Sequence, residues 1–206
     1  VEVAEPHLRV TAPGMPDLVL ALNPLGGRPV STMIWDDQVS VVAPDHRADD
    51  WFSQVVGLEV VLAYMPDTVR REVDRDWAPR GGRTGFADGF PFLLIGDASL
   101  ADLNQRLGSA LPMNRFRPNL VVAGSAPFAE DGWRAIRIGG LEMEVVKPCA
   151  RCVVTTTSQE RGARDGDEPL RTLATFRRQD GKVMFGQNVV HYGVGRLTVG
   201  DPVTIA

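Results

Sequence analysis

Lysine, histidine and cysteine are scarce in this chain of 206 residues, and each scarcity excludes a class of protein. Two cysteines, Cys149 and Cys152, cannot form the several disulfides that hold a small secreted scaffold together. The three histidines, His7, His46 and His191, lie far apart, so the chain lacks the closely spaced ligands of a structural zinc site. A net charge of −4 gives no concentrated basic surface, so we expect no nucleic-acid partner.

Long apolar runs are also missing. No stretch approaches the roughly 18 residues that a membrane-spanning helix needs, and no signal-peptide pattern follows Val1. We therefore expect a soluble, cytoplasmic protein with no membrane partner. Arginine, in contrast, is abundant, because Lys147 and Lys182 are the only lysines among 22 basic residues. Arginine binds phosphate and carboxylate groups with two parallel hydrogen bonds, which favours an anionic ligand.

Short β-rich runs alternate with turn residues along most of the chain, and this pattern predicts strands joined by tight connections. Many short strands with few helices indicate a mixed, β-rich (α+β) fold of barrel-like form. The expected strands cover residues 7–11, 18–22, 30–35, 38–43, 58–65, 91–95, 120–122, 134–138, 141–146, 153–157 and 197–205, and a short helix is expected near residues 170–177.

Two longer helices have recognisable ends. Asp45 is expected to cap a helix whose apolar residues are spaced on one face, and Gly57 ends it. Ser99, followed three residues later by Asp102, resembles a capping box, and Gly108 ends the second helix. Between these helices, residues 67–87 are charged and rich in glycine, proline and arginine. We therefore predict a β-rich domain over residues 1–66, a connection over 67–87 and a second domain over 88–206.

The run Lys147-Pro-Cys-Ala-Arg-Cys152 lies between two predicted strands, so rigid elements hold it on both sides. Arg151 is expected to lower the pKa of the neighbouring thiol, and a thiolate is a good ligand for a thiophilic metal. The alternative is that Cys149 and Cys152 pack in the core as small apolar residues. Thioredoxin-like chemistry is disfavoured, because the pair does not precede a helix.

Two other segments carry candidate binding groups. Arg117 and Asn119 flank a proline at the start of a predicted strand, where they would offer a cationic fork and an amide. The alternative is a solvated loop with a strand-initiating proline. The run Phe185-Gly-Gln-Asn188 reads equally well as a turn before a strand. The acidic residues near Asp165 are more typical of a solvated loop than of a metal site.

The order of these segments resembles the MOSC domain, and in particular its amidoxime-reducing branch with mitochondrial and bacterial members. The resemblance covers residues 88–206 and is weaker before Asp88. It implies a MOSC β-barrel with short helices, preceded by part of the family's N-terminal β-rich domain. The segments that carry it are Asp88–Ile95, Ala98–Asn104, Arg117–Asn119, Cys149–Cys152, Glu168–Leu170, Phe185–Gln187 and Val199–Val203.

This resemblance implies a molybdenum cofactor, with molybdenum bound by Cys152 as both metal ligand and catalytic centre. Arg117 and Asn119 would hold the pterin or its phosphate. Gly89, Phe90 and Ala150 stand where animal relatives have small hydroxylated residues, so contacts there would come from backbone groups or would be absent. The remaining cofactor-binding candidates are Arg151, Asp88, Gly89, Phe90 and Asn188. The family is also associated with pyridoxal phosphate binding.

The function that the resemblance implies is reduction of N-hydroxylated compounds, with electrons from an iron–sulfur or cytochrome-type donor. One alternative is a sulfur-carrier or cofactor-sulfurating protein in which Cys152 carries a persulfide. Another is a non-catalytic cofactor-binding fragment, because the family's first strands and their basic cofactor contacts are missing from this sequence.

Overall fold

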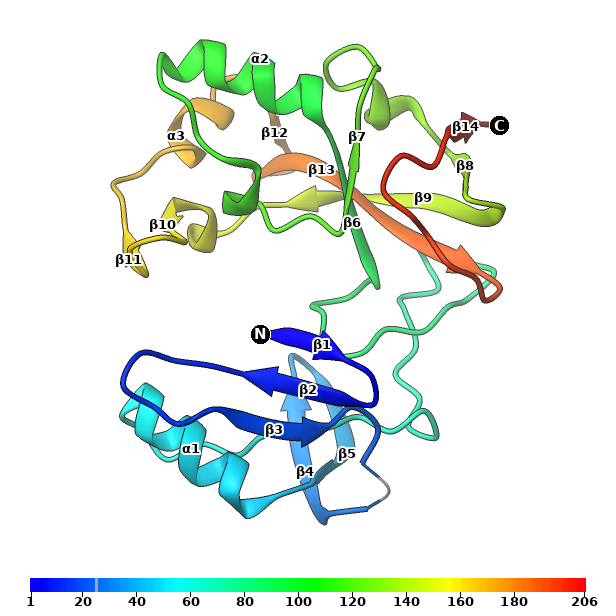
Figure 1. The fold of residues 1–206 in the computed structure, drawn as a ribbon. Helices are drawn as coiled ribbons and strands as arrows, with labels where there is room; N and C mark the ends of the chain where they lie inside the picture. Colours follow the sequence, from blue (N-terminus) through cyan, green and yellow to red (C-terminus); the bar gives the residue numbers. More distant parts are fainter. Residues whose placement is uncertain (25) are drawn as a thin grey trace. The chain divides into compact units, whose positions relative to one another are not determined.

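The structure is a computed structural model that describes residues 1–24 and 26–206. The chain forms two compact units, Val1–Arg71 and Glu72–Ala206. Figure 1 colours the first unit from blue to cyan and the second mainly from green to red. Both units are β-rich and contain few, short helices, which confirms the fold class expected from the sequence. No helix in the described residues is long and apolar enough to cross a membrane.

The first unit combines two small antiparallel sheets with one helix. One sheet contains β1 (Glu2–Ala4), β2 (His7–Val10) and β3 (Leu18–Ala21). The other is the hairpin of β4 (Arg28–Ile34) and β5 (Asp37–Ala43), and the helix is α1 (His46–Val56). The alternation of buried and exposed residues along β3 and β5 places one face of each strand in the interior. The core of this unit consists of Val10, Leu18, Leu20, Ala48 and Trp51.

The ends of α1 agree with the sequence prediction. The Asp45 side chain accepts a hydrogen bond from the backbone nitrogen of Arg47 at 2.9 Å. Gly57 takes the left-handed conformation, with φ of 73°, that closes a helix without steric strain.

The strand expected over residues 58–65 is wrong, because side chains of α1 bind the backbone of this segment. Ser53 Oγ accepts from the nitrogen of Val60 at 3.0 Å, and Asp49 Oδ1 accepts from the nitrogen of Leu62 at 2.8 Å.

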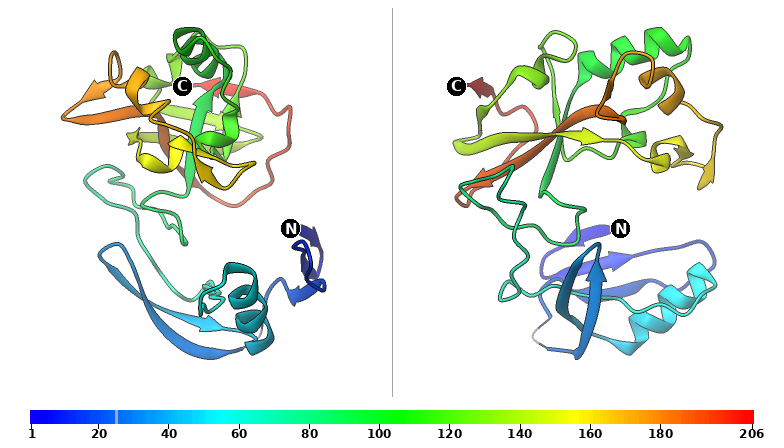
Figure 2. Two further views of the ribbon diagram at one scale, coloured as in Figure 1. Left: turned by 90° about the vertical axis from the view of Figure 1, so that its left-hand side faces the viewer. Right: turned by 180° about the vertical axis from the view of Figure 1, so that it is seen from behind.

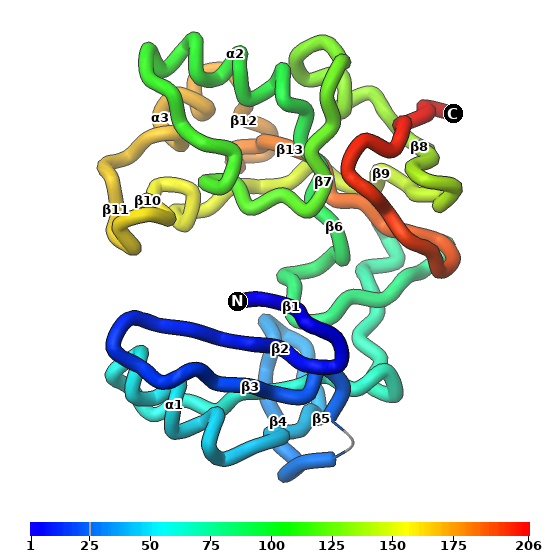
Figure 3. Tube along the Cα trace, viewed as in Figure 1, coloured from blue at the N-terminus to red at the C-terminus, as the bar shows by residue number. Residues whose placement is uncertain are grey.

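The second unit contains a seven-stranded sheet that is nearly closed into a barrel. Its order is β14-β8-β9-β13-β6-β7, with β12 paired to β13; only β6 and β7 are parallel. Figure 3 shows the long strands β9 and β13 running side by side through this unit. The strands are β6 (Phe92–Gly96), β7 (Leu120–Val122), β8 (Ala135–Ile138), β9 (Leu141–Ala150), β12 (Arg178–Gln179), β13 (Lys182–Tyr192) and β14 (Val203–Ile205).

Helices and a small hairpin cover this sheet. The two further views in Figure 2 show α2 packed over it. The interior on this side holds Phe116 and Phe185, whose ring centroids lie 4.4 Å apart. These covering elements are α2 (Asp97–Leu107), α3 (Leu170–Leu173), the hairpin of β10 (Thr157–Ser158) and β11 (Ala163–Arg164), and 3-10 helices at Met113–Arg115, Ala129–Gly132 and Val153–Thr156.

The predicted cap of α2 is wrong, because the helix begins after Gly96 and Ser99 lies inside it. The Ser99 hydroxyl instead donates to the buried carboxylate of Glu130 at 2.7 Å. It also accepts a hydrogen bond from the nitrogen of Phe128 at 2.8 Å. Ser99 therefore makes tertiary contacts and does not cap the helix.

The predicted strand at residues 153–157 is mostly a 3-10 helix, despite its β-branched composition. The hydroxyls of Thr155 and Thr156 donate to backbone carbonyls three residues earlier, at 2.9 and 2.7 Å. These local bonds stabilise the turn against the extended conformation. The last strand and the helix at residue 170 also form, but both are shorter than expected.

Candidate functional site

The segment from Cys149 to Cys152 is anchored at the end of the long strand β9. Ala150 is the last residue of β9 and pairs with Met184 of β13. The nitrogen of Arg151 then donates to the carbonyl of Val183 at 2.7 Å. Cys152 follows directly, in extended conformation, at the start of the 3-10 helix Val153–Thr156. Strand pairing therefore fixes the backbone up to the residue before Cys152.

The two cysteines have different environments. Cys149 is half-buried, whereas Cys152 is exposed, and both are free thiols. Arg151 Nη1 donates to Cys149 Sγ at 3.0 Å. Burial raises the pKa of the Cys149 thiol, and the neighbouring guanidinium of Arg151 offsets only part of that effect. Arg151 was expected to lower the pKa of a neighbouring thiol; for Cys149, the thiol that it contacts, this is wrong, because burial outweighs the guanidinium. Cys152 is left exposed.

Arg151 also joins this segment to the one that contains Arg117. Its Nη2 donates to the carbonyl of Phe116 at 2.7 Å, and its guanidinium carbon lies 5.6 Å from the centre of the Phe116 ring. Arg117 follows with φ of 55°, a left-handed conformation that is uncommon for a residue with a side chain. Its side chain is exposed. The structure therefore connects Arg151 with the Arg117 turn through Phe116.

Asn119 extends the sheet beside β6. Its backbone nitrogen donates to the carbonyl of Leu93 at 2.9 Å, and its Oδ1 accepts from the nitrogen of Leu93 at 2.8 Å. Leu93 pairs with Asn188 of β13, which in turn pairs with Lys147 of β9. Asn119, Asn188 and Lys147 thus lie on one line across three strands. Because Oδ1 of Asn119 is already used, its amide NH₂ is the group left for a ligand.

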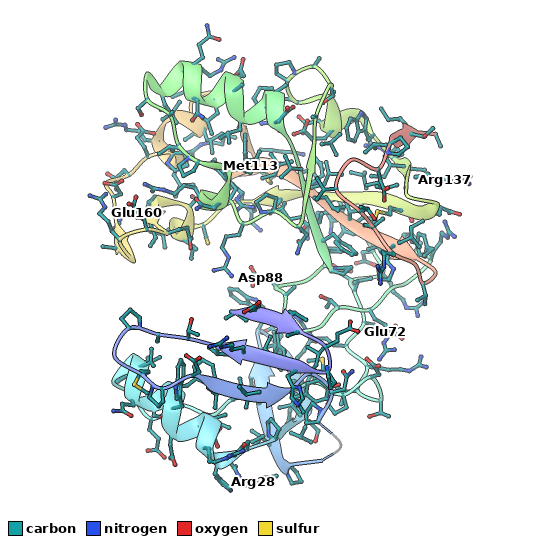
Figure 4. All side chains as sticks on the ribbon, viewed as in Figure 1. Arg28, Glu72, Asp88, Met113, Arg137 and Glu160 are labelled. Carbon is teal, nitrogen blue, oxygen red and sulfur yellow. The ribbon has the colours of Figure 1, made fainter. Side chains whose placement is uncertain are left out.

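The segment Asp88–Phe90 leads into β6, and Figure 4 labels Asp88 there. Asp88 is exposed, and its negative charge contributes to the raised pKa of Cys149. Phe90 is buried, and its ring centre lies 5.9 Å from Lys147 Nζ. A Cβ built on Gly89 meets no atom within 4 Å, so the backbone there is open to approach. These contacts bring the segment close to β9.

Two basic residues near these segments were not assigned from the sequence. Lys147 Nζ lies 4.7 Å from the centre of the Trp77 ring as well as near Phe90. Arg115 is almost fully buried, and its Nη2 donates to Asp165 Oδ2 at 2.8 Å. Hydrogen bonds from Arg161 and Arg115 lower the pKa of Asp165, so this acidic loop is paired and not merely solvated. The position of Lys147 close to the two cysteines, in a chain with only two lysines, could have marked it as a site residue from the sequence.

These residues fit an anionic cofactor that carries a metal. Arg151 Nε and Arg115 Nη1 are buried guanidinium nitrogens without a hydrogen-bond partner in the described structure. A buried unsatisfied donor is costly, and an anion would satisfy it. The described residues contain no group of three or more histidine, cysteine or acidic side chains able to hold a metal. Cys152 can therefore supply one soft ligand to a metal whose other ligands belong to a cofactor.

Comparison with known proteins identifies relatives along the whole chain. The family model described as MOSC domain matches residues 81–204. Mitochondrial amidoxime-reducing component 1 from Homo sapiens is 41% identical over 126 residues, which cover 57% of this chain and 37% of the human protein. Mitochondrial amidoxime reducing component 2 from Bos taurus is 32% identical over 216 residues, covering 95% of this chain and 62% of the bovine protein.

A second group of relatives carries a different name. Molybdenum cofactor sulfurase from Oryza sativa subsp. japonica is 34% identical over 169 residues, which cover 74% of this chain and 20% of the rice protein. In each of these three comparisons the matched region spans less than two thirds of the relative's own length.

Proposed function

This chain belongs to the MOSC domain family, and we propose that it binds a molybdenum cofactor and reduces N-hydroxylated compounds. The names of the human and bovine relatives, amidoxime-reducing components, support the substrate class. The observation that carries the proposal is the exposed thiol of Cys152, which follows a strand end that two neighbouring contacts hold in place. An accessible soft ligand on a rigid support is what a thiophilic metal requires.

In this proposal Cys152 is the metal ligand and the catalytic residue. The guanidinium groups of Arg117 and Arg151, with the amide of Asn119, bind the anionic part of the cofactor by charge-assisted hydrogen bonds. The Asp88–Phe90 backbone and the amide of Asn188 complete the binding groups. When bound, the molybdenum cofactor supplies the two-electron chemistry at the N–O bond.

Arg151 and the two cysteines have separate roles in positioning the cofactor. Arg151 is held by Cys149 and Phe116, so little side-chain entropy is lost when its remaining nitrogen binds an anion. Burial favours the protonated, neutral form of Cys149, and Cys152 is the exposed thiol that binds the metal. Reduction of N–OH to N–H consumes two electrons and two protons and releases water. The electrons come from a separate iron–sulfur or cytochrome-type donor. We further propose that the protein is cytoplasmic.

The test is a direct assay of the full chain after incubation with molybdenum cofactor. An aromatic amidoxime is supplied with a chemical reductant, and the amidine product is quantified. We expect product from the wild type and from an Arg137→Ala control, whose side chain is exposed on β8, and none from Cys152→Ser. Equal product formation by wild type and Cys152→Ser would refute the role of this thiol.

A sulfur-carrier function is the second candidate, because the rice relative is named a molybdenum cofactor sulfurase and Cys152 is exposed. In that function Cys152 accepts a sulfur atom as a persulfide. Cyanide-labile sulfur on Cys152, without amidine formation, would favour it over the reductase. A chain that shows neither activity but still retains cofactor would support a non-catalytic binding module.

A further inference from the structure

A polar pocket, which we call the arginine pocket, lies in the second unit beside β13. Its volume is about 330 Å³, at the small end of the range for small-molecule sites. Basic side chains dominate its charged lining, whereas Asp131 is the one acidic residue that lines it in the described structure. Its lining includes Arg134, Pro148, Arg177, Arg178, Met184 and Gln187.

The arginine pocket is separate from the cysteine site. Gln187 pairs with Pro148 across β13 and β9, and the next pair is Asn188 with Lys147. Successive residues of a strand point to opposite faces of the sheet. Gln187 and Pro148 therefore face the arginine pocket, while Asn188 and Lys147 face the other side. None of the residues assigned above to cofactor binding lines this pocket.

One of the three arginines is already neutralised. Arg177 binds Asp131 through two hydrogen bonds, of 2.6 and 2.9 Å, and Gln187 Nε2 donates to the same carboxylate at 2.7 Å. Arg177 Nε also donates to the carbonyl of Met184 at 3.3 Å. This network holds Arg177 and Gln187 in place and neutralises the carboxylate of Asp131.

The other two arginines carry uncompensated charge. Arg134 Nη1 donates to the backbone carbonyls of Trp133 and Asp131, at 2.8 and 3.3 Å, which orients the guanidinium without neutralising it. Neither Arg134 nor Arg178 forms an ion pair within residues 1–24 and 26–206. Arg178 lies in β12 and Arg134 lies in the segment before β8, so the two positive charges come from separate elements. Both side chains are exposed, and two like charges that line one pocket give it a local positive potential.

We propose that the arginine pocket binds a small oxyanion, of the phosphate class, between Arg134 and Arg178. A guanidinium donates two parallel hydrogen bonds to phosphate or carboxylate oxygens. The pocket volume admits such an anion with a small organic substituent. Pro148 and Met184 form part of the wall, and they flank the backbone that supports Cys149, so the bound anion lies behind the cysteine segment.

The test is calorimetric titration of the full chain with inorganic phosphate, with sodium chloride used to keep the ionic strength constant. We expect wild type to bind and the double variant Arg134→Ala/Arg178→Ala to bind at least about tenfold more weakly. The matched control is Arg137→Ala/Arg196→Ala, which removes two exposed arginines outside the pocket and should bind as wild type does. Absence of binding to wild type, or equal loss in both double variants, would overturn the proposal.

A second measurement locates the anion. With ¹³C-methyl methionine, phosphate should shift the signal of Met184, which lines the pocket, and leave that of the fully buried core residue Met143 unchanged. Phosphate bound only near Arg117 would leave the Met184 signal in place and would persist in the Arg134→Ala/Arg178→Ala variant. That result would assign the anion to the cysteine site and refute the arginine pocket.

Discussion

Arg151 Nη1 donates a hydrogen bond to Cys149 Sγ at 3.0 Å, so the arginine between the two cysteines is bound to the first of them. This contact gives the thiols different roles. Cys149 is half-buried and helps to hold the guanidinium, whereas Cys152 is exposed and free to bind a ligand.

The thiols should therefore differ in reactivity. Because burial raises the pKa of Cys149, less of it is thiolate at neutral pH, and its access to reagent is poorer. Iodoacetamide at pH 7.5 should modify Cys152 at least about tenfold faster than Cys149. Trypsin cleaves after Arg151 and separates the two residues, so peptide mass spectrometry gives both rates. Equal rates would contradict the assigned environments.

The hydroxyl of Tyr192 should lose its proton at a higher pH than that of an ordinary tyrosine. Its hydroxyl donates to Glu144 Oε2 at 2.6 Å, and burial together with this carboxylate raises its pKa from 10.0 to about 12. A raised folded-state pKa means that this tyrosine's contribution to stability is complete below pH 10 and is lost as the pH rises toward 12. Absorbance at 295 nm should show a late phase that Tyr192→Phe removes and Tyr64→Phe keeps. A late phase that persists in Tyr192→Phe would exclude this assignment.

Gly186 should be far less tolerant of substitution than Gly181. Both glycines have positive φ, 79° and 75°, so an added side chain is strained at each. A Cβ at Gly186 would also lie 2.7 Å from Ile95 Cγ1 and 2.9 Å from the carbonyl oxygen of Leu94, whereas one at Gly181 meets nothing within 4 Å. Gly186→Ala should therefore cost about 1–3 kcal/mol more in unfolding free energy than Gly181→Ala, measured in urea. Similar costs would mean that the backbone moves away freely.

Asp45→Ala should weaken α1. The Asp45 side chain satisfies the backbone nitrogen of Arg47, and loss of such a cap typically costs about 1 kcal/mol. Asp50→Ala is the matched control, because it removes the same charge from an exposed position inside the helix. The free energy of unfolding of the first unit, followed by the fluorescence of tryptophans that include the buried Trp51, should fall only for Asp45→Ala. An equal decrease in both variants would assign the effect to charge.

Patterns that depend on one element were predictable from the sequence. Asp45 and Gly57 define the ends of α1, and residues 120–122 form the expected strand, because caps and apolar alternation are local signals. The predicted strand at residues 153–157 failed because threonine hydroxyls bind nearby carbonyls, which composition does not reveal. Ser99 failed as a cap because its partner, Glu130, is distant in the sequence.

The contacts among the residues of the candidate site were less predictable. The spacing of Cys149 and Cys152 led us to expect a binding segment, which stays a prediction. It did not indicate that Arg151 would turn toward the first cysteine and the carbonyl of Phe116. The burial of Arg115 depends on a contact with Asp165, fifty residues later, so no local pattern marks it. The arginine pocket likewise joins residues from β12, β13 and the segment before β8.

Molybdenum content per chain shows whether Cys152 is the ligand that holds the metal. Wild type, Cys149→Ser and Cys152→Ser are incubated with molybdenum cofactor, separated from free cofactor and analysed by mass spectrometry of the metal. We expect nearly stoichiometric molybdenum in the wild type, most of it retained in Cys149→Ser, and very little in Cys152→Ser, where a hydroxyl replaces the soft sulfur ligand. Equal molybdenum in wild type and Cys152→Ser would contradict the assignment of Cys152 as the metal ligand.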